Sequence, residues 1–176
     1  MATDMAQTVS IRVATKTDQE AIRQLTEEAF ARTAEARLVD ALRACNALDL
    51  EYVGIDGDGK VVGHVAFSTV TGAGPEHRLK MTCLAPISVS VALQNTGIGS
   101  AMIEQCLEIL KSQNFDLVLV LGPPAYYTRF GFDPVLAQKV TAPYAGDAFM
   151  AMAFTAAVEK ALPIEVTFAT PFSRFE

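Results

Sequence analysis

The stretch Gln94-Asn95-Thr96-Gly97-Ile98-Gly99-Ser100 has the form Q-x-x-G-x-G and joins an apolar segment to an amphipathic one. Upstream, residues 81–91 have the composition of a strand, and downstream, apolar side chains recur at helical spacing over residues 98–110. The unit closes with Leu117–Leu121, a continuous apolar run typical of a strand buried on both faces of a parallel pair. The pattern predicts strand, turn, helix and strand, in that order.

A glycine-rich turn before a helix suits the binding of pyrophosphate, because the helix N-terminus leaves unpaired N–H groups and about half a positive charge. A dinucleotide site requires G-x-G-x-x-G and an acid after the second strand, whereas here Leu117–Leu121 runs into Gly122-Pro123-Pro124. A nucleoside-triphosphate loop requires Gly-Lys-Ser/Thr, and the turn has no lysine. Glycines that only shape the turn remain an alternative.

Two longer segments resemble a known family. "LAPISVSVALQNTGIGSAMIEQCLEIL", followed by "LVLVLGPPAYYTRFGF", is similar to the GNAT superfamily of acyl-CoA N-acetyltransferases, and most of all to small bacterial members with L-x-P-L-A-V, Q-G-x-G-I-G and G-D-P-x-Y-Y-x-R-F-G-F. "AEARLVDALR" and "FSRF" extend the resemblance over most of the chain. Asn95 and Thr96 stand where Gly and Arg are usual, Val91 where proline is common, and Pro123 where the motif has an acid. One cationic phosphate contact is therefore absent from the turn.

The resemblance implies an α/β (α+β) fold in which a mixed, mostly antiparallel twisted sheet is flanked by helices. A central parallel strand pair splays around the CoA site. The chain has 176 residues, of which 51% are hydrophobic and 19% charged, and this suits a single domain over residues 1–176 with a full-sized core. Residues 1–7 are polar and expected to be flexible.

Acetyl-CoA (CoA) is the cofactor that the resemblance implies. The turn at residues 94–100 is expected to hold the pyrophosphate, and the backbone of residues 87–89 to pair with the pantetheine arm as an added strand. The residues expected to contact the cofactor are Ile87, Ser88, Val89, Gln94, Asn95, Thr96, Gly97, Ile98, Gly99, Ser100, Gly122, Tyr126, Tyr127 and Phe130.

Tyr127 is the expected catalytic residue. It stands four positions before Gly131, as does the superfamily tyrosine that faces the thioester sulfur. Tyr126 is its neighbour, and helical geometry turns the two about 100° apart, so only one is expected to face the sulfur. The sequence has neither G-x-S-x-G nor a cysteine near a histidine base, which favours direct acyl transfer in a ternary complex.

Phe30, Glu35 and His64 are candidates for the acceptor site. Phe30 and Glu35 lie at the joint of two expected helices that in the superfamily wall the acceptor pocket, and Glu35 and His64 are also possible bases. A solvated helix face for Glu35 and packing within the sheet for His64 remain alternatives. The expected acceptor is an amine on a small molecule or a peptide. Fourteen basic against twenty acidic side chains give a net charge of −6, which argues against nucleic-acid binding and favours a cationic acceptor.

The remaining composition argues against several other classes. Cys45, Cys83 and Cys106 lack C-x-x-C spacing and lie in apolar contexts, so buried, inert thiols in a reducing compartment are expected. Two histidines without a matching cluster of ligands predict no metal site. Residues 1–7 lack the blocks of a signal peptide, and the longest small apolar run, residues 148–154, is too short to span a bilayer. A cytoplasmic protein without a membrane partner is expected, as a monomer or a homodimer.

Three functional classes follow. The first is an N-acetyltransferase that uses acetyl-CoA. The second is a non-catalytic acyl-CoA-binding regulatory module, which the altered phosphate turn and the lack of an acidic residue in the expected strand at residues 81–91 allow. The third, a structural domain without a cofactor, is disfavoured by the paired motifs.

Local patterns predict the remaining elements. Thr17-x-x-Glu20 is interpreted as a capping box, Asp56-Gly57-Asp58-Gly59 as a hairpin turn between residues 50–55 and 61–70, and Pro124 as the start of a short helix that Gly131 ends. Residues 148–155 and 164–168 are expected to be late strands, joined by a short helix or turn.

Overall fold

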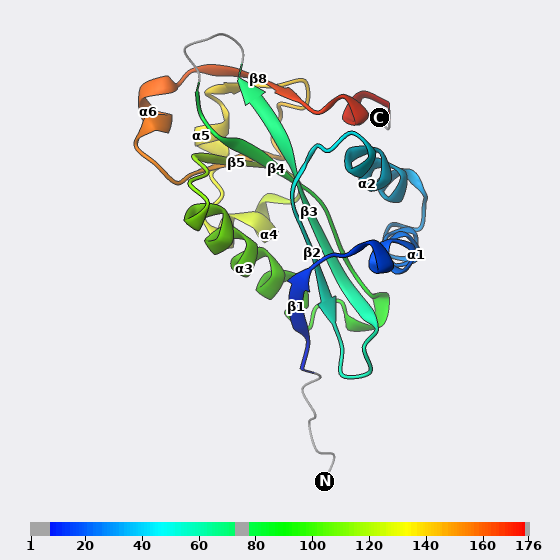
Figure 1. Cartoon of the computed structure of the whole chain (residues 1–176). Coiled ribbons are helices and arrows are strands. Elements are labelled where there is room, and N and C mark those ends of the chain that lie inside the picture. The colour runs from blue at the N-terminus through cyan, green and yellow to red at the C-terminus, as the bar shows by residue number, and fades with distance from the viewer. Residues whose placement is uncertain (1–7, 73–77, 175–176) are drawn as a thin grey trace.

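The computed structural model describes residues 8–72 and 78–174, which form one mixed sheet with helices on both of its faces (Figure 1). The expected flexibility of residues 1–7 lies outside the described residues. The strands are β1 (Ser10–Val13), β2 (Leu48–Ile55), β3 (Val61–Gly72), β4 (Met81–Val89), β5 (Leu117–Leu121), β6 (Val140–Thr141), β7 (Phe149–Ala153) and β8 (Ile164–Phe168). The helices are α1 (Gln19–Phe30), α2 (Ala34–Ala44), α3 (Ile98–Ser112), α4 (Pro124–Tyr127), α5 (Pro134–Ala137) and α6 (Ala157–Ala161). Short 3-10 turns occupy Lys16–Asp18, Val91–Leu93, Thr128–Phe130 and Thr170–Arg174.

The sheet runs in the order β1-β2-β3-β4-β5-β7. Neighbours along this path are antiparallel except for β4 and β5, which are parallel. β8 pairs with the end of β3, and β6 pairs with β8. The expectation of a mostly antiparallel mixed sheet with a central parallel pair is confirmed.

The parallel pair is short, and its end positions the site. β4 and β5 are in register from Met81↔Leu117 to Leu84↔Val120, where the pairing stops. On its other edge β4 stays paired with β3, but with a bulge: Val65 lies opposite Ile87 while Phe67 lies opposite Leu84, which leaves one extra residue in β4. Pro86 has no N–H to donate to a neighbouring strand, and the bulge bends β4. Together they explain why β4 turns away from β5 at this point.

Side chains along β3 alternate between the two faces of the sheet, and each face is covered by different helices. Val65 and Phe67 are completely buried in a core with Met102 and Ile103 of α3, whose apolar stripe the sequence predicts. α1 and α2 lie on the opposite face, and α1 contacts β3 and β4 there (Figure 1). Because α3 begins directly beside the end of β4, the helix N-terminus is held at the edge of the sheet where β4 leaves β5.

Several local predictions are confirmed, and three need correction. The hairpin, the short helix at Pro124 and the two late strands are present. The capping box is formed by Thr15 and Asp18 rather than by Thr17 and Glu20. Asp18 is preferred because it also pairs with Arg12 at 2.8 Å, and that hydrogen bond holds the pKa of Asp18 well below its usual range.

The other two corrections concern a cysteine and a strand end. Cys83 and Cys106 are buried as expected, and burial raises the pKa of both thiols to about 12. Cys45 is exposed, because it follows the last turn of α2 instead of belonging to its buried stripe. β4 ends at Val89, before Val91 enters a 3-10 turn. No helix within the described ranges is long and apolar enough to cross a membrane.

Candidate active site

The turn between β4 and α3 is built to present backbone N–H groups. Asn95 and Gly97 have positive φ values of 61° and 92°, a region that asparagine and glycine tolerate best. The Gln94 side chain donates to the Val89 carbonyl at 3.2 Å, and the Thr96 hydroxyl donates to the Leu93 carbonyl at 2.6 Å. These bonds fix the turn from within, and the N–H groups of the first turn of α3 are left for an external acceptor.

A cleft of about 540 Å³ lies in front of this turn. It is lined by nine of the expected cofactor residues: Ile87, Val89, Gln94, Asn95, Gly97, Ile98, Gly99, Ser100 and Tyr126. Ile87 and Val89 belong to the part of β4 that extends beyond its pairing with β5. The cleft therefore joins a helix N-terminus to an open strand edge, an arrangement that fits an anionic group attached to an extended, amide-containing chain.

Five expected cofactor residues lie outside the lining of this cleft. The Ser88 side chain is buried on the α1 side of β4 and donates to the Thr26 hydroxyl at 3.3 Å. Phe130 packs against the edge of the Tyr126 ring, with centroids 5.4 Å apart. The Thr96 hydroxyl is used inside the turn, and Gly122 and Tyr127 contact each other at the end of β5.

Arg129 is a cleft residue that the sequence reasoning missed. Its guanidinium lies 4.1 Å from the centre of the Tyr126 ring, a cation–π contact that holds the charge beside the turn. The Tyr126 hydroxyl in turn lies 3.1 Å from the point that a Cβ on Gly99 would occupy. The turn lacks the usual arginine at Thr96, and Arg129 brings a cation to the same cleft from another element. Its position three residues after Tyr126, on one helical face, is the signal that could have found it.

Tyr127 is not part of the described lining of this cleft, and its side chain packs in the core beside the end of β5. Its ring packs edge-on against Phe132 and lies directly against Gly122, and only 7% of the residue is exposed. Burial, with smaller contributions from Tyr126 and Cys83, raises the pKa of Tyr127 to about 12. The phenol is therefore protonated at neutral pH and can act as a hydrogen-bond donor.

The three acceptor-site candidates have different surroundings. Phe30 ends α1 and is 37% exposed. Glu35 accepts hydrogen bonds from Arg32, with Nε at 2.9 Å from one carboxylate oxygen. His64 is completely buried, so its side chain cannot reach solvent or a bound molecule directly. Among the described residues, no hydrogen bond, ion pair or ring contact is seen between any two of these three side chains.

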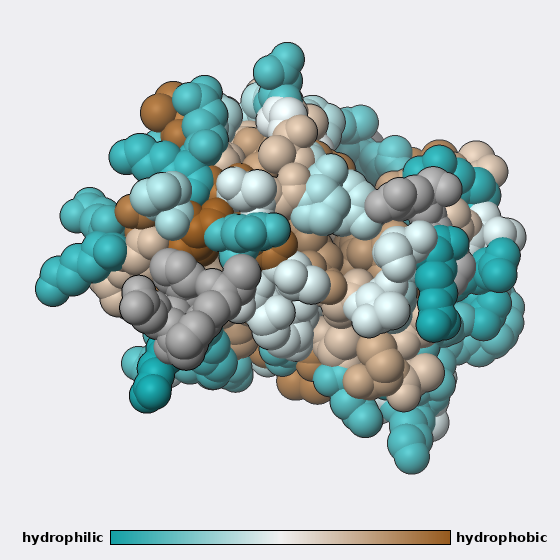
Figure 2. All heavy atoms as spheres, turned by 90° about the horizontal axis from the view of Figure 1, so that it is seen from above, coloured by the Kyte–Doolittle hydropathy of each residue, from teal (hydrophilic) through white to brown (hydrophobic). Residues whose placement is uncertain are grey.

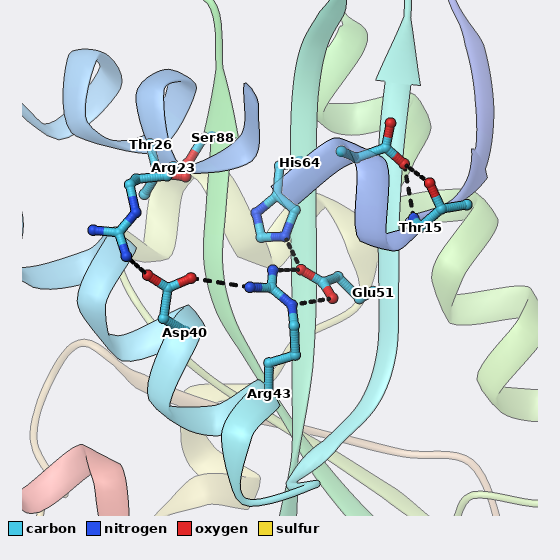
Figure 3. Close-up of polar contacts among 9 residues, drawn as sticks. Thr15, Arg23, Thr26, Asp40, Arg43, Glu51, His64 and Ser88 are labelled. Carbon is cyan, nitrogen blue, oxygen red and sulfur yellow. Dashed lines mark hydrogen bonds and ion pairs between the residues drawn. The ribbon is translucent and has the colours of Figure 1, made fainter. Parts of the chain in front are cut away.

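His64 belongs instead to a chain of ion pairs between α1, α2 and the sheet (Figure 3). Its Nε2 lies 3.0 Å from a Glu51 oxygen, and Arg43 bridges Glu51 at 2.5 Å and Asp40 at 3.0 Å. Asp40 also pairs with Arg23 of α1. Burial acts to raise the pKa of Glu51, but hydrogen bonds from His64 and Arg43 outweigh it, so the pKa lies below its ordinary value.

This network ties the helices to the strand that borders the cleft. His64 faces Ser88 across the β3–β4 ladder, and Ser88 bonds Thr26 of α1 (Figure 3). The sequence reasoning missed this network because Glu51 lies on β2, whereas Arg43 and Asp40 lie on α2. Among residues 8–72 and 78–174, no group of three or more His, Cys, Asp or Glu side chains is arranged to hold a metal ion.

Comparison with known proteins agrees with the fold. The sequence model described as the acetyltransferase (GNAT) domain matches residues 10–135, and the chain belongs to this family of acetyltransferases. Two Escherichia coli K12 relatives are uncharacterised N-acetyltransferases: YhbS, 36% identical over 70% of this chain and 72% of its own length, and YjhQ, 33% identical over 77% and 76%.

Solved structures support the same assignment. The crystal structure of E. coli YhbS in complex with CoA superposes with a TM-score of 0.89 at 30% identity, covering 100% of this chain and 98% of that one. A GNAT family acetyltransferase from Brucella melitensis, in complex with acetyl-CoA, gives a TM-score of 0.78 at 32% identity, with coverage of 94% and 99%. The GNAT fold expected from the two sequence motifs is confirmed.

The ion-pair network predicts a specific loss of stability. Glu51→Gln leaves Arg43 and His64 without their carboxylate and should lower the free energy of unfolding by roughly 2–3 kcal/mol, or the Tm by roughly 4–12 °C. Because folding lowers the pKa of Glu51, its contribution is present above the unfolded value of about 4.3 and is lost as the pH falls through the folded value. The difference in Tm between the two proteins should therefore shrink below about pH 4.3. Glu108→Gln, at an exposed pair with Lys111, is the matched control and should change the free energy by under about 1 kcal/mol.

The contact between Gly122 and Tyr127 gives a second prediction. A Cβ on Gly122 would lie 2.4 Å from Cε2 of the Tyr127 ring, so Gly122→Ala must displace the ring and should destabilise the protein by about 1–3 kcal/mol. Urea unfolding of Gly122→Ala, Tyr127→Ala and the double variant measures the coupling. The double variant should be markedly less destabilised than the sum of the two single variants, because removing the ring removes the clash. Additive effects would show that the ring lies elsewhere. Gly57→Ala, with no atom within 4 Å of its Cβ, is the control.

Proposed function

We propose that the protein transfers an acetyl group from acetyl-CoA to a primary amine, by direct transfer in a ternary complex. The observation that carries this proposal is the continuity between the cleft at the N-terminus of α3 and the open edge of β4. The proposed acceptor is an amine on a small molecule, with a peptide amine as the other possibility considered. CoA and acetyl-CoA are bound in the two similar crystal structures.

The residues of the cleft fit the parts of this cofactor. The N–H groups at the start of α3 would bind the pyrophosphate, with Arg129 supplying the cation that Thr96 does not. Backbone groups of Ile87 and Val89 would bind the pantetheine amides, and the alternation of the strand explains why the Ser88 side chain is free to bond Thr26 instead. Gly99 leaves room for a ligand beside the Tyr126 hydroxyl.

Tyr127 would contact the departing sulfur. When bound, acetyl-CoA supplies an activated acyl group on a thiol leaving group. Tyr127 stays protonated at neutral pH because its pKa is raised to about 12, so its role is to donate a hydrogen bond rather than to lose its proton. An N–H of β4 near Val89 would stabilise the oxyanion. The amine must be neutral to attack, and the described residues that line the cleft include no carboxylate or histidine.

That missing base favours a second candidate, an acyl-CoA-binding module without catalysis. His64 and Glu51 could in principle act as a base, but they pair with each other in the ion-pair network, and His64 is completely buried. Both candidates require CoA binding, and only the first requires the release of free thiol. Turnover of acetyl-CoA with any amine would exclude the second.

The two tyrosines make the catalytic proposal testable. Tyr127→Phe should lower kcat by roughly 10- to 1000-fold, because a hydrogen bond to the leaving group is lost in the transition state, while the Kd for acetyl-CoA changes little. Free-thiol release with a turned-over amine and calorimetric titration measure the two quantities. Tyr126→Phe is the matched control, and it should affect the Kd more than kcat because Tyr126 lines the cofactor cleft. Full kcat in Tyr127→Phe together with a lost kcat in Tyr126→Phe would reverse the assignment.

The anion-binding turn is tested by thermal shift. A ligand at a hundredfold excess over its Kd stabilises the folded state by about 2.7 kcal/mol, so CoA and acetyl-CoA should raise the Tm by roughly 5–10 °C. NAD and ATP should give no comparable shift, and phosphopantetheine should give less than CoA. Gly97→Asp should abolish the shift by placing a negative charge where the pyrophosphate approaches.

Gly97→Asn is the matched control for this substitution. It imposes the same side-chain size and the same positive φ without a charge, so it separates repulsion from strain. The Asn variant should keep most of the CoA shift. Equal loss in both variants would assign the effect to the turn's backbone, and an unchanged shift in Gly97→Asp would place the cofactor elsewhere.

A further inference from the structure

A second cavity, of about 330 Å³, lies where β4 and β5 separate. Ala85 and Leu121 line it, and they are the first residues beyond the last β4–β5 pair, Leu84↔Val120. Its other walls come from α2, β4, β7, β8 and the C-terminal 3-10 turn, and include Leu38, Cys83, Phe149, Phe168 and Phe172. The cavity is therefore built by elements from both halves of the chain around the point at which the sheet opens.

The lining of this cavity is almost entirely apolar. Among its described residues none carries a charge, and the Cys83 thiol and the Tyr144 hydroxyl are the polar side-chain groups. Three aromatic rings form one wall: Tyr144 and Phe168 pack edge to face with centroids 5.3 Å apart, and Phe168 and Phe172 with centroids 5.5 Å apart. At the end of the molecule where β8 lies, hydrophilic side chains gather at the periphery, and apolar or weakly polar ones lie nearer the centre (Figure 2).

The cavity and the cofactor cleft share the same strand. Ala85 lines the cavity and Ile87 lines the cleft, two residues further along β4. The ring of Tyr127 lies against Gly122, which directly follows β5. A molecule in the cavity would therefore meet a thioester laid along β4 at the point where the strands diverge.

We propose that this cavity binds the body of the acceptor, and that the acceptor is a small arylalkyl primary amine with no charge other than its amino group. This inference rests on the proposed acetyl transfer. A volume near the lower end for ligand sites suits about one ring and a short chain. Edge-on aromatic partners select a ring, and a second ammonium or a carboxylate would be desolvated there without a partner.

The apolar lining would also allow the amine to lose its proton without a catalytic base. An ammonium group has a pKa of about 10.4 in water, and desolvation disfavours its charged form, so an apolar cavity promotes loss of the proton to water. The neutral nitrogen then attacks the thioester carbonyl carbon. A C–N bond forms, the C–S bond breaks, the nitrogen loses its second proton to water, and CoA leaves as the thiol or thiolate. The net charge of −6 had suggested a cationic acceptor, and the cavity favours an apolar one instead.

Steady-state kinetics with saturating acetyl-CoA test this proposal, with free thiol as the readout. The probes are 2-phenylethylamine, ethanolamine and putrescine, which share a primary amine and differ in an apolar, a hydroxyl or a second cationic group. We expect kcat/KM for 2-phenylethylamine to exceed that for the other two by about 100-fold or more, in line with burial of a ring. Higher kcat/KM for ethanolamine or putrescine would overturn the proposal.

Two variants test whether the preference for 2-phenylethylamine arises in this cavity. Phe172→Ala should lower kcat/KM for 2-phenylethylamine by about tenfold through loss of a ring contact, and leave the KM for acetyl-CoA unchanged within about twofold. Leu121→Ala, at a residue that is 51% exposed, should also lower kcat/KM for 2-phenylethylamine. It replaces Phe172→Ala in this test if that variant does not fold. Val135→Ala, at a residue 63% exposed and outside the cavity, is the control and should have no effect. Unchanged kinetics in both cavity variants would place the acceptor elsewhere.

A calorimetric titration of 2-phenylethylamine into the CoA-bound protein separates this inference from the proposed reaction. If the amine binds, and binds about tenfold more weakly to Phe172→Ala, but no amine releases thiol, then the cavity assignment stands and the proposed acetyl transfer fails. If another amine is acetylated while 2-phenylethylamine neither binds nor reacts, then the transfer stands and this inference fails. Absence of both binding and turnover for 2-phenylethylamine overturns it as well.

Discussion

The early end of the parallel β4–β5 pair is the constraint on which the rest of the site depends. After Leu84 and Val120 the two strands no longer pair, while β4 remains bonded to β3 on its other edge through a bulge. The strand thus keeps its extended shape and exposes one edge of N–H and C=O groups, which water or a ligand must satisfy. The cleft at the N-terminus of α3 lies along this edge, and the apolar cavity lies at its start. A sheet that continued its pairing to the end of both strands would bury the edge and fill both spaces.

An open strand edge needs support from its other neighbours, and the helices provide it. The turn that precedes α3 is fixed to β4 by the bond from Gln94 to the Val89 carbonyl. On the opposite face, the chain of ion pairs from Arg23 to His64 joins α1 and α2 to β2 and β3. Such a network costs desolvation energy, and an apolar core could be as stable. Its directional bonds hold two helices and two strands in one arrangement, so we infer that it maintains the shape of the splayed sheet rather than takes part in the chemistry.

Short-range patterns in the sequence predicted the parts of the site that depend on local chemistry. The turn at residues 94–100, the buried strand Leu117–Leu121 and the short helix at Pro124 are present because glycine, apolar runs and proline act over a few residues. What the sequence could not show depends on distant segments meeting. The Glu51–His64 contact joins two strands, and the apolar cavity combines α2 with residues more than a hundred positions later. His64 was proposed for the acceptor site because alternation gives the face of a strand but not what covers that face. The roles of the individual site residues stay predictions.

The cleft is polar and the cavity is apolar. In the proposed reaction this difference suits an anionic cofactor in the cleft and an amine that must lose its positive charge in the cavity. At the cleft, helix N–H groups and Arg129 would stabilise the anionic cofactor. At the cavity, apolar walls would disfavour the ammonium and favour the neutral amine that can attack. Tyr127, which packs against Gly122 after β5, has its pKa raised to about 12, against about 8.5 for an ordinary thiol, so full transfer of its proton to a departing thiolate is uphill by a few kcal/mol. A hydrogen bond from the intact phenol has no such cost. The burial that raises the pKa of Tyr127 therefore makes it a poor acid and a permanent donor, which is the property that a leaving sulfur requires.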